Sequence, residues 1–256
     1  MTRTWAKKWL SLVGLLAVAL SACGGNKTLQ VGVDKGFAPF SYVEQGEVRG
    51  FEIDLWKEIA RREGFAYEFK PLSQGEILSS LKNGKLDVGL GGLTINKERR
   101  QLVEFTTPYY YTGLVMLVPE NDQNTVNAYD LNGKVIATEI GTTAYRYASK
   151  VKGVKEIKAF PDIKLAYSQL MAGEVDAVIF DRANVKQFAQ TTGKHKVRMI
   201  DNRLTIEQYG IAVNKDIGFS GRIDTTLREM GRDGTFAKIY RKWFGENPPS
   251  VPGVKK

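Results

Sequence analysis

Residues 81–92 read LKNGKLDVGLGG and combine the end of an amphipathic stretch, a glycine turn and an apolar run that ends in two glycines. Glycine after a periodic segment is a common helix stop, and a short apolar run after it is typical of a buried strand. Residues 170–181, LMAGEVDAVIFD, repeat the order of leucine, glycine, apolar residue, aspartate and β-rich run. One such unit in each half of the chain predicts two α/β lobes of related design.

The rest of the chain alternates short β-branched runs with amphipathic stretches. We expect strands at 29–34 and 66–71, and a helix at 51–64 that stops at Gly64. The last helix, expected within GTFAKIYRKWFGENPP (234–249), places its aromatic side chains on one face. Alternation of this kind predicts parallel sheets covered by helices.

The order of the elements predicts that the chain passes between the lobes twice, so that one lobe is built from two separate parts of the chain. An apolar stretch at 107–121, TPYYYTGLVMLVPEN, and a strand near 205–213 contain the two passages. We expect lobe 1 at 29–108 plus 210–247, lobe 2 at 114–204, crossing segments at 109–113 and 205–209, and a loose, proline-rich tail at 248–256.

The amino terminus has the pattern of an export signal. Arg3, Lys7 and Lys8 precede an apolar run at 9–20 that is too short to span a membrane as a mature helix. The only cysteine of the chain, Cys23, follows in the sequence LSAC, which resembles a bacterial lipobox. In a lipobox the cysteine becomes the acylated first residue of the mature lipoprotein.

These features predict a signal peptide at 1–22 and a lipid-anchored linker at 23–28, with an ordinary signal and a chance cysteine as the alternative. Removal of the three cations of the signal lowers the formal charge from +9 to +6. The remaining basic residues are scattered, so nucleic acid is not an expected partner. A content of 43% hydrophobic and 25% charged residues is typical of a folded globular chain.

Charged or small polar residues follow the expected parallel strands, where ligands of open α/β sheets bind. They are Asp34 after the first strand, Gly91, Gly92 and Thr94 after the second, and Glu139 and Asp181 after two strands of lobe 2. Arg99 lies one turn further on, in the segment GGLTINKERR. Cations oppose the partial positive charge at a helix start, so they indicate either a solvated turn or a bound anion.

The two opposite charges suit one kind of ligand. Arg99 can hold a carboxylate through two hydrogen bonds, and Asp181 of the other lobe can accept from an ammonium group. An α-amino acid carries both groups on one carbon, so its binding would favour closure of the lobes. Phe37 and Phe40 would supply apolar walls. The plainer alternatives are a helix-capping role for Asp181 and a core role for Phe37.

From Leu29 to Gly245 the chain resembles the bacterial extracellular solute-binding proteins, family 3, which serve ABC importers of polar amino acids. The segments that carry the resemblance are VGVDKGFAPFSY, GFEIDLWKEIA, LDVGLGGLTINKERRQLVEFTTPYY, DLNGKVIA, VDAVIFD and GTFAKIYRKWFG. The resemblance implies a type II periplasmic-binding-protein fold, with two parallel-sheet lobes, two crossing strands and a ligand cleft. It also implies a monomer that delivers an amino acid to a membrane permease, without a cofactor or a metal.

The resemblance also implies roles for particular residues. Arg99, Thr94 and the backbone N–H of Thr143 would hold the ligand carboxylate. Asp181 and the carbonyl of Gly92 would hold the α-ammonium group. Asp34 would face the ligand side chain, and Phe37 would pack on it.

Three positions depart from the glutamine binders of the family. Gln74 replaces a second aromatic wall, Glu139 replaces a lysine of lobe 2, and Phe180 replaces a histidine before the acid. Because Glu139 reverses a charge, it would act with Asp34 to favour a cationic side chain such as that of arginine or lysine. Glutamine or another neutral polar amino acid remains the alternative.

Two further functions are open to this fold. A few relatives are enzymes such as periplasmic cyclohexadienyl dehydratases, and Glu139 in a closed cleft could transfer a proton. Against this, His195 lies in an expected solvated turn and no motif for a nucleophile, a nucleotide or a metal occurs. A sensor module or a surface antigen is the other alternative. The sequence leaves open whether the anchor lies in a periplasm or on an outer cell face.

Overall fold

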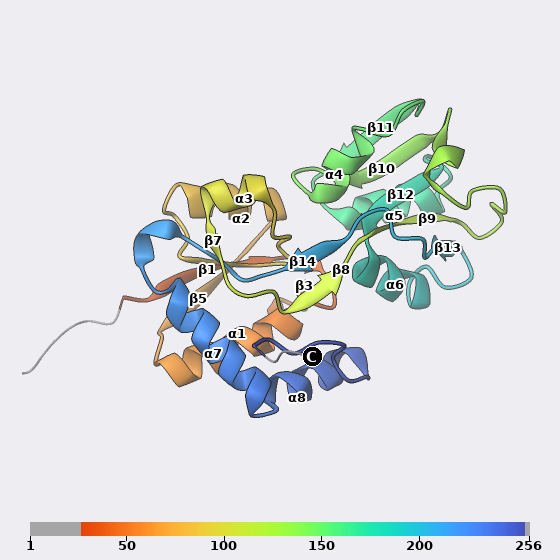
Figure 1. Ribbon diagram of the computed structural model, residues 1–256. Coiled ribbons are helices and arrows are strands. Elements are labelled where there is room, and N and C mark those ends of the chain that lie inside the picture. Colours follow the sequence, from red (N-terminus) through yellow and green to blue (C-terminus); the bar gives the residue numbers. More distant parts are fainter. Residues whose placement is uncertain (1–26, 254–256) are drawn as a thin grey trace, which may run out of the picture.

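The computed structural model describes residues 27–253 and shows two lobes side by side (Figure 1). The expected signal peptide at 1–22 and Cys23 lie outside the described residues. Lobe 1 combines the beginning and the end of the chain, drawn in red to yellow and in blue, while lobe 2 is drawn in green and cyan. No helix within 27–253 is both long and apolar enough to span a membrane.

Lobe 1 is built on a five-stranded sheet of order β5-β1-β6-β15-β7. β1 runs parallel to β5 and β6, whereas β15 is antiparallel to β6 and β7. A small antiparallel sheet, β2-β3-β4, lies beside it. The strands are β1 (Leu29–Asp34), β2 (Gly36–Phe37), β3 (Ser41–Glu44), β4 (Glu47–Arg49), β5 (Tyr67–Leu72), β6 (Val88–Leu90), β7 (Glu104–Phe105) and β15 (Ala212–Val213).

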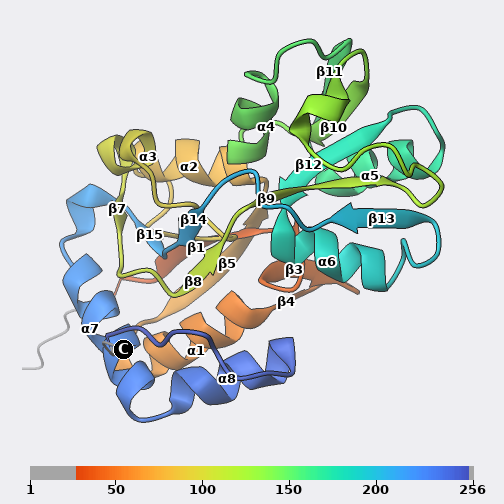
Figure 2. The ribbon, with the colours of Figure 1, turned by 45° about the vertical axis from the view of Figure 1, so that its right-hand side comes forward.

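Helices cover both faces of this sheet (Figures 1 and 2). α2 and α3 pack on one face, and α1, α7 and α8 pack together on the other. The helices are α1 (Phe51–Glu63), α2 (Gln74–Lys82), α3 (Lys97–Leu102), α7 (Ser220–Arg232) and α8 (Thr235–Phe244), with a short 3-10 turn η2 (Lys215–Ile217). α1 ends at Gly64, whose φ of 68° is the left-handed conformation that stops a helix.

Lobe 2 repeats the plan with a sheet of order β11-β10-β12-β9-β13. β10 is parallel to β11 and β12, and β9 is antiparallel to β12 and β13. The strands are β9 (Leu114–Pro119), β10 (Val135–Glu139), β11 (Glu156–Phe160), β12 (Ala177–Asp181) and β13 (Val197–Ile200). The helices are α4 (Thr143–Ala148), α5 (Ile163–Met171) and α6 (Arg182–Gln190), with a 3-10 turn η1 (Ala128–Leu131).

Two strands join the lobes and pair with each other along the way. β8 (Tyr110–Thr112) and β14 (Glu207–Tyr209) form an antiparallel pair in which Glu207 lies opposite Thr112 and Tyr209 opposite Tyr110. They run side by side between the lobes in both views (Figures 1 and 2). We refer to this two-stranded ribbon as the hinge, since it is the connection about which the two lobes are expected to move.

The repeated sequence units build the same local structure in both lobes. In lobe 1, the carboxylate of Asp87 accepts a 2.8 Å hydrogen bond from the backbone N–H of Gln30 on β1. In lobe 2, the carboxylate of Asp176 accepts a 2.7 Å hydrogen bond from the backbone N–H of Val135 on β10. Each aspartate therefore ties the turn after a helix to the first residues of the neighbouring strand, which explains why both units carry it.

Two features differ from the expectation. The sheets are mixed rather than wholly parallel, because β9 and β15 enter from the hinge and run against their neighbours. The tail also packs more closely than expected over the residues described. Pro252 is buried, and its carbonyl lies so close to Gly231 of α7 that a Cβ there would come within 2.2 Å of it.

Candidate functional site

The eight side chains and backbone groups that the sequence singled out lie together on the facing surfaces of the lobes. β1 ends at Asp34, β10 at Glu139 and β12 at Asp181, and the glycine pair follows β6 directly. Five polar members of the group are almost completely buried, with exposed fractions of 2 to 6%: Asp34 4%, Thr94 6%, Arg99 2%, Glu139 5% and Asp181 3%. The sixth, Thr143, is half-buried. Sheet topology brings these groups to one place, since the parallel strands of each lobe end at the cleft.

Arg99 is held in a defined direction. Asn96 caps α3 and accepts a 2.8 Å hydrogen bond from the backbone N–H of Arg99. The guanidinium donates to the side-chain oxygen of Gln74 at 2.7 Å and to the carbonyl of Thr94 at 3.3 Å. Burial lowers the pKa of Arg99 to about 10, opposed by the negative charges of Glu207 and Asp181. The group therefore stays a buried cation at neutral pH.

Gln74 consequently has a different role from the aromatic wall that it replaces. Its oxygen accepts from Arg99, and its amide nitrogen donates to the carbonyl of Gly91 at 3.0 Å. Gln74 therefore links the guanidinium of Arg99 to the turn formed by Gly91 and Gly92, which is called the Gly91–Gly92 turn below. In this way it holds Arg99 in position.

A buried carboxylate that is not among the site residues expected from the sequence holds the Gly91–Gly92 turn in place. Glu52 of α1 is fully buried, and it accepts from the backbone N–H of Gly92 at 2.9 Å and from the hydroxyl of Tyr109. Burial raises the pKa of Glu52 to about 7, against the effect of these donors. Gly92 has a φ of 60°, and a Cβ there would lie 2.1 Å from the ring of Phe37, so only glycine fits.

Phe37 belongs to an aromatic cluster that spans both lobes. Its ring centroid lies 5.3 Å from that of Phe40, 5.8 Å from that of Phe180 in lobe 2 and 6.0 Å from that of Tyr209 in the hinge. Phe37 is 2% exposed. It is therefore a core residue in the closed structure as well as a wall of the cleft, and Phe180 fills space against it.

Asp34 and Glu139 face each other from opposite lobes. Asp34 accepts a 2.8 Å hydrogen bond from the N–H of Gly36, yet burial raises its pKa to about 7. Burial also raises the pKa of Glu139 to about 9, and the next causes are the charges of Asp34, Asp162 and Asp181. Both carboxyls are thus poised to take up protons when no cation lies between them.

Asp181 occupies the capping position of α6 but makes no capping hydrogen bond. Its carboxylate instead accepts from the hydroxyl of Tyr209 on β14. Burial raises the pKa of Asp181 well above its usual value, and the nearby charge of Glu207 adds to this effect. The capping alternative is therefore not what the structure shows.

A further carboxylate, that of Glu207, lies between the threonines of the two lobes. Thr94 of lobe 1 donates to it at 2.8 Å and Thr143 of lobe 2 donates to the same oxygen at 3.1 Å. Glu207 is 7% exposed. The sequence offered one signal that could have pointed to it: a charged residue inside the apolar crossing segment TIEQYGIAV, two positions before Tyr209 and hence on the same face of the strand.

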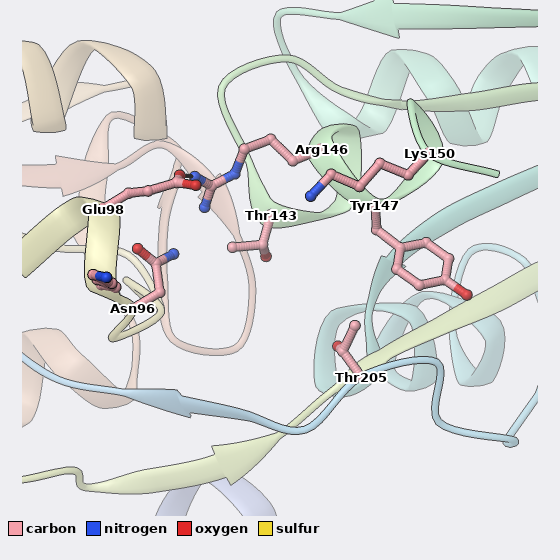
Figure 3. A pocket seen from close by; sticks show the side chains of 8 residues that line it. Asn96, Glu98, Thr143, Arg146, Tyr147, Lys150 and Thr205 are labelled. Atoms are coloured by element: carbon pink, nitrogen blue, oxygen red, sulfur yellow. Dashed lines mark ion pairs between the residues drawn. The ribbon is translucent and has the colours of Figure 1, made fainter.

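A groove with a volume of about 350 Å³ opens between the lobes beside this cluster. It is lined by Asn96, Lys97 and Glu98 of lobe 1, by Thr143, Arg146 and Tyr147 of α4, by Lys150 just after that helix, and by Thr205 near the hinge. Figure 3 shows Glu98 and Arg146 pointing toward each other from opposite lobes, and they form an ion pair. Thr143 points into the same groove. Because Thr143 also donates to Glu207, the groove is the side on which the buried cluster lies nearest to solvent.

The lobes are closed against each other. On the side of α6, Asn184 of lobe 2 donates to the backbone carbonyl of Ala38 of lobe 1. Since Arg99 and the carboxyl groups of the cluster are at most 7% exposed, a ligand can reach them only when the lobes separate. Within residues 27–253, no group of three or more histidine, cysteine or acidic side chains is arranged to hold a metal ion.

A fold of two α/β lobes on a two-stranded hinge, with charged strand ends facing each other, defines a two-lobed binding protein. The sequence profile of the bacterial extracellular solute-binding proteins, family 3, matches residues 29–246. The chain belongs to this family, whose profile covers both lobes and the hinge.

Relatives and solved structures agree with this assignment. The L-cystine-binding protein TcyJ of Escherichia coli K12 is 28% identical, over 92% of this chain and 95% of that protein. The probable histidine-binding protein of Neisseria gonorrhoeae is 30% identical, over 94% and 96% of the two chains. The arginine-, lysine-, histidine-binding protein ArtJ of Geobacillus stearothermophilus superposes with a TM-score of 0.83 at 33% identity, covering 87% of this chain and 97% of that one. These neighbours confirm the predicted two-lobed, type II periplasmic-binding-protein fold.

Proposed function

We propose that this protein binds a free α-amino acid between its lobes and delivers it to the permease of an ABC importer. The observation that carries the proposal is the buried guanidinium of Arg99 on α3 together with the buried carboxyl of Asp181 at the end of β12, which come from opposite lobes. The carboxylate of the ligand would pair with Arg99, Thr94 and the backbone of Thr143. The ammonium group would pair with Asp181 and the carbonyl of Gly92. The relatives named for cystine, histidine and arginine binding support an amino acid as the ligand class.

We further propose that the side chain of the ligand is cationic. The cluster contains four carboxyl groups, those of Asp34, Glu139, Asp181 and Glu207, around the single guanidinium of Arg99. A ligand with a positive side chain reduces the repulsion between Asp34 and Glu139, whereas a negative one increases it. The name of ArtJ, which binds arginine, lysine and histidine, supports this preference.

A neutral ligand such as glutamine is the second candidate, and one observation favours it. The raised pKa of Glu139, about 9, makes it a neutral acid at pH 7, and a neutral carboxyl can donate a hydrogen bond to an amide oxygen. The two candidates therefore differ in the protonation state that binding selects: ionised for a cation, protonated for an amide.

The experiment is thermal unfolding of residues 26–256, stripped of carried-over ligand, in the presence of each natural amino acid and cystine. A ligand present at about 100 times its dissociation constant adds about 2.7 kcal/mol of stability. We expect a large upward shift of Tm with arginine or lysine and a smaller one with glutamine. A shift with glutamine alone would select the neutral candidate, and no shift with any amino acid would contradict the proposal.

We also propose that the protein performs no covalent chemistry on its ligand. The family and its relatives are solute-binding proteins. Prephenate lacks an amine and therefore does not match the pairing of Arg99 with Asp181, whereas arogenate is itself a zwitterion and is the stricter test of the two. Incubation with prephenate or arogenate, followed by chromatography, should show no more product than the uncatalysed reaction forms. A neighbouring permease and ATPase gene pair would favour transport over a sensory role.

The family is extracellular, and we propose that this member is exported and tethered through an acylated Cys23. The lipobox-like LSAC sequence supports the proposal. In cells that express the full chain, the protein should sediment with membranes, and Cys23→Ala should prevent acylation. Mass spectrometry of the mature amino terminus would show a diacylglyceryl cysteine. An unmodified terminus downstream of Cys23 would contradict the tether.

A further inference from the structure

Glu207 occupies a place where it can connect both lobes at once. It lies at the start of β14, in the hinge, and its side chain is 7% exposed. One of its carboxylate oxygens accepts from the hydroxyl of Thr94 at 2.8 Å and from the hydroxyl of Thr143 at 3.1 Å. Because the two threonines belong to opposite lobes, both bonds can exist together only when the lobes are closed.

The surroundings of this carboxylate resemble those proposed for the ligand carboxylate. Its negative charge acts on the guanidinium of Arg99, which lies in the same buried cluster. Thr94 and Arg99 are groups to which the proposed function assigns the carboxylate of the amino acid, and the third is the backbone N–H of Thr143, whose side-chain hydroxyl donates to Glu207. A hydroxyl has a single proton to donate, so Thr94 cannot donate to Glu207 and to a ligand at the same time.

We propose that Glu207 is an internal substitute for the ligand carboxylate, which holds the lobes closed and which an amino acid must displace. The identity of the displaced contact rests on the proposed function, but the closing effect of Glu207 does not. The hinge ribbon fixes the backbone of Glu207 by pairing it with Thr112. Only its side chain needs to turn away, which makes the exchange possible without a rearrangement of the hinge.

By holding the lobes closed without a ligand, Glu207 lowers the apparent affinity for the amino acid. The permease can therefore meet a closed protein that carries no ligand. A bond that closes the lobes without a ligand stabilises a competitor of the bound state, so it weakens apparent binding. It also means that closure alone does not report occupancy. Removal of the carboxylate should therefore open the protein when no amino acid is present.

The test measures the distance between the lobes in the absence of any amino acid. Residues 26–256 contain no cysteine, so dyes can be attached through Gln101→Cys on α3 and Lys152→Cys beside α4, both exposed positions on either side of the groove. Single-molecule energy transfer then gives the closed fraction. We expect Glu207→Ala to lower the ratio of closed to open molecules about fivefold, the change expected for loss of one net hydrogen bond.

A rescue experiment separates this role from a general structural one. Truncation to alanine leaves room for a small carboxylate, so sodium acetate at about 100 mM should restore closure of Glu207→Ala, while sodium chloride at the same ionic strength should not. Thr143→Val, which removes one of the donors, should also open the protein and should not respond to acetate. Gln208→Ala, on the same strand but on its other face, is the matched control and should stay closed.

If Glu207→Ala stays as closed as the unsubstituted protein, or if acetate acts no differently from chloride, the proposal is wrong. Glu207→Gln keeps the size of the side chain and guards against a folding defect in the alanine variant. It should be intermediate, since an amide oxygen accepts hydrogen bonds but has no charge. These readouts use no amino acid, so they stand even when the panel of amino acids shows no ligand.

Discussion

The side-chain amide of Asn184 in lobe 2 donates a 2.8 Å hydrogen bond to the backbone carbonyl of Ala38 in lobe 1. The hydroxyl of Tyr167 donates to the oxygen of the same amide at 2.6 Å, which fixes its orientation. Asn184 is 3% exposed. It therefore forms a buried contact that exists only in the closed state and that does not involve the groups assigned to the ligand.

The first prediction concerns this contact. Asn184→Ala should weaken amino-acid binding about tenfold, because loss of a buried hydrogen bond in the closed state costs about 1 to 3 kcal/mol. Isothermal titration calorimetry with the ligand found in the panel measures the effect. Lys186→Ala, an exposed position on the same helix, is the control and should leave the affinity unchanged. An unaltered affinity in Asn184→Ala would show that the contact does not contribute to closure.

The second prediction concerns the choice of side chain. Glu139→Lys should weaken the binding of arginine by about a hundredfold or more, since truncation or reversal of one partner of a buried charge pair costs about 2 to 5 kcal/mol. The binding of glutamine should change much less. Glu139→Gln should lie between the unsubstituted protein and Glu139→Lys. Equal losses for arginine and glutamine would remove Glu139 from the specificity of the site.

The third prediction concerns Arg99, the cation of the protein that would contact the α-carboxylate of every amino acid. Arg99→Lys keeps a positive charge but loses the planar, two-pronged donor geometry and the contact with Gln74. It should weaken arginine and glutamine alike, by about tenfold to a hundredfold. Arg100→Lys on the exposed face of the same helix serves as the control. Calorimetry on both ligands decides, and a selective loss of only one ligand would contradict a carboxylate-binding role.

The fourth prediction follows from the raised pKa values of Asp34, about 7, and Glu139, about 9. In the unfolded chain these groups lose their protons near a pH of about 4, whereas in the folded protein they keep them to higher pH. The folded state therefore binds more protons in this interval, and its free energy of unfolding falls as the pH rises. Denaturant unfolding should show this loss from about pH 4 to about pH 9, and a smaller loss in Glu139→Gln.

A cationic ligand should show the opposite dependence in its affinity. Its binding favours the ionised form of both carboxyls, so the affinity for arginine should rise between pH values of about 6 and about 8. Glutamine has the same α-ammonium and α-carboxylate groups, so the pH profile of its affinity is the reference for the titration of those groups. The exposed Glu174 supplies a control through Glu174→Gln, which should leave both pH profiles unchanged. A rise for glutamine equal to that for arginine would assign the effect to the common groups.

The fifth prediction concerns the Gly91–Gly92 turn. Gly92→Ala meets two costs, a φ of 60° and the ring of Phe37 at 2.1 Å from the new Cβ. Gly133→Ala meets only the first, since Gly133 has a φ of 74° and nothing within 4 Å of its Cβ position. We expect Gly92→Ala to lower the free energy of unfolding by about 1 to 3 kcal/mol more than Gly133→Ala, the usual cost of overpacking. Similar stabilities in the two variants would show that the Phe37 ring can move aside.

The sequence alone determined the fold class and much of the site. The repeated units LKNGKLDVGLGG and LMAGEVDAVIFD predicted two related lobes, and the residues after each strand predicted where charges would gather. These inferences succeeded because they depend on local rules: glycine ends a helix, apolar runs form strands, and parallel strands of one lobe end on one side. The order of the strands within each sheet needed long-range pairing, so the antiparallel β9 and β15 were not expected.

Only the tertiary structure decided how the charged groups are paired. Glu52 is the only charged residue of α1 that is fully buried, and its position under Gly92 depends on how α1 packs below the sheet. Glu207 meets Thr94 and Thr143 because the hinge strand passes between the two lobes, more than 60 positions away from either threonine. Sequence spacing carries no information about such contacts, since the partners approach only when separate elements pack. The sequence thus determined which groups are present at the cleft, and the packing of the lobes decided which of them touch.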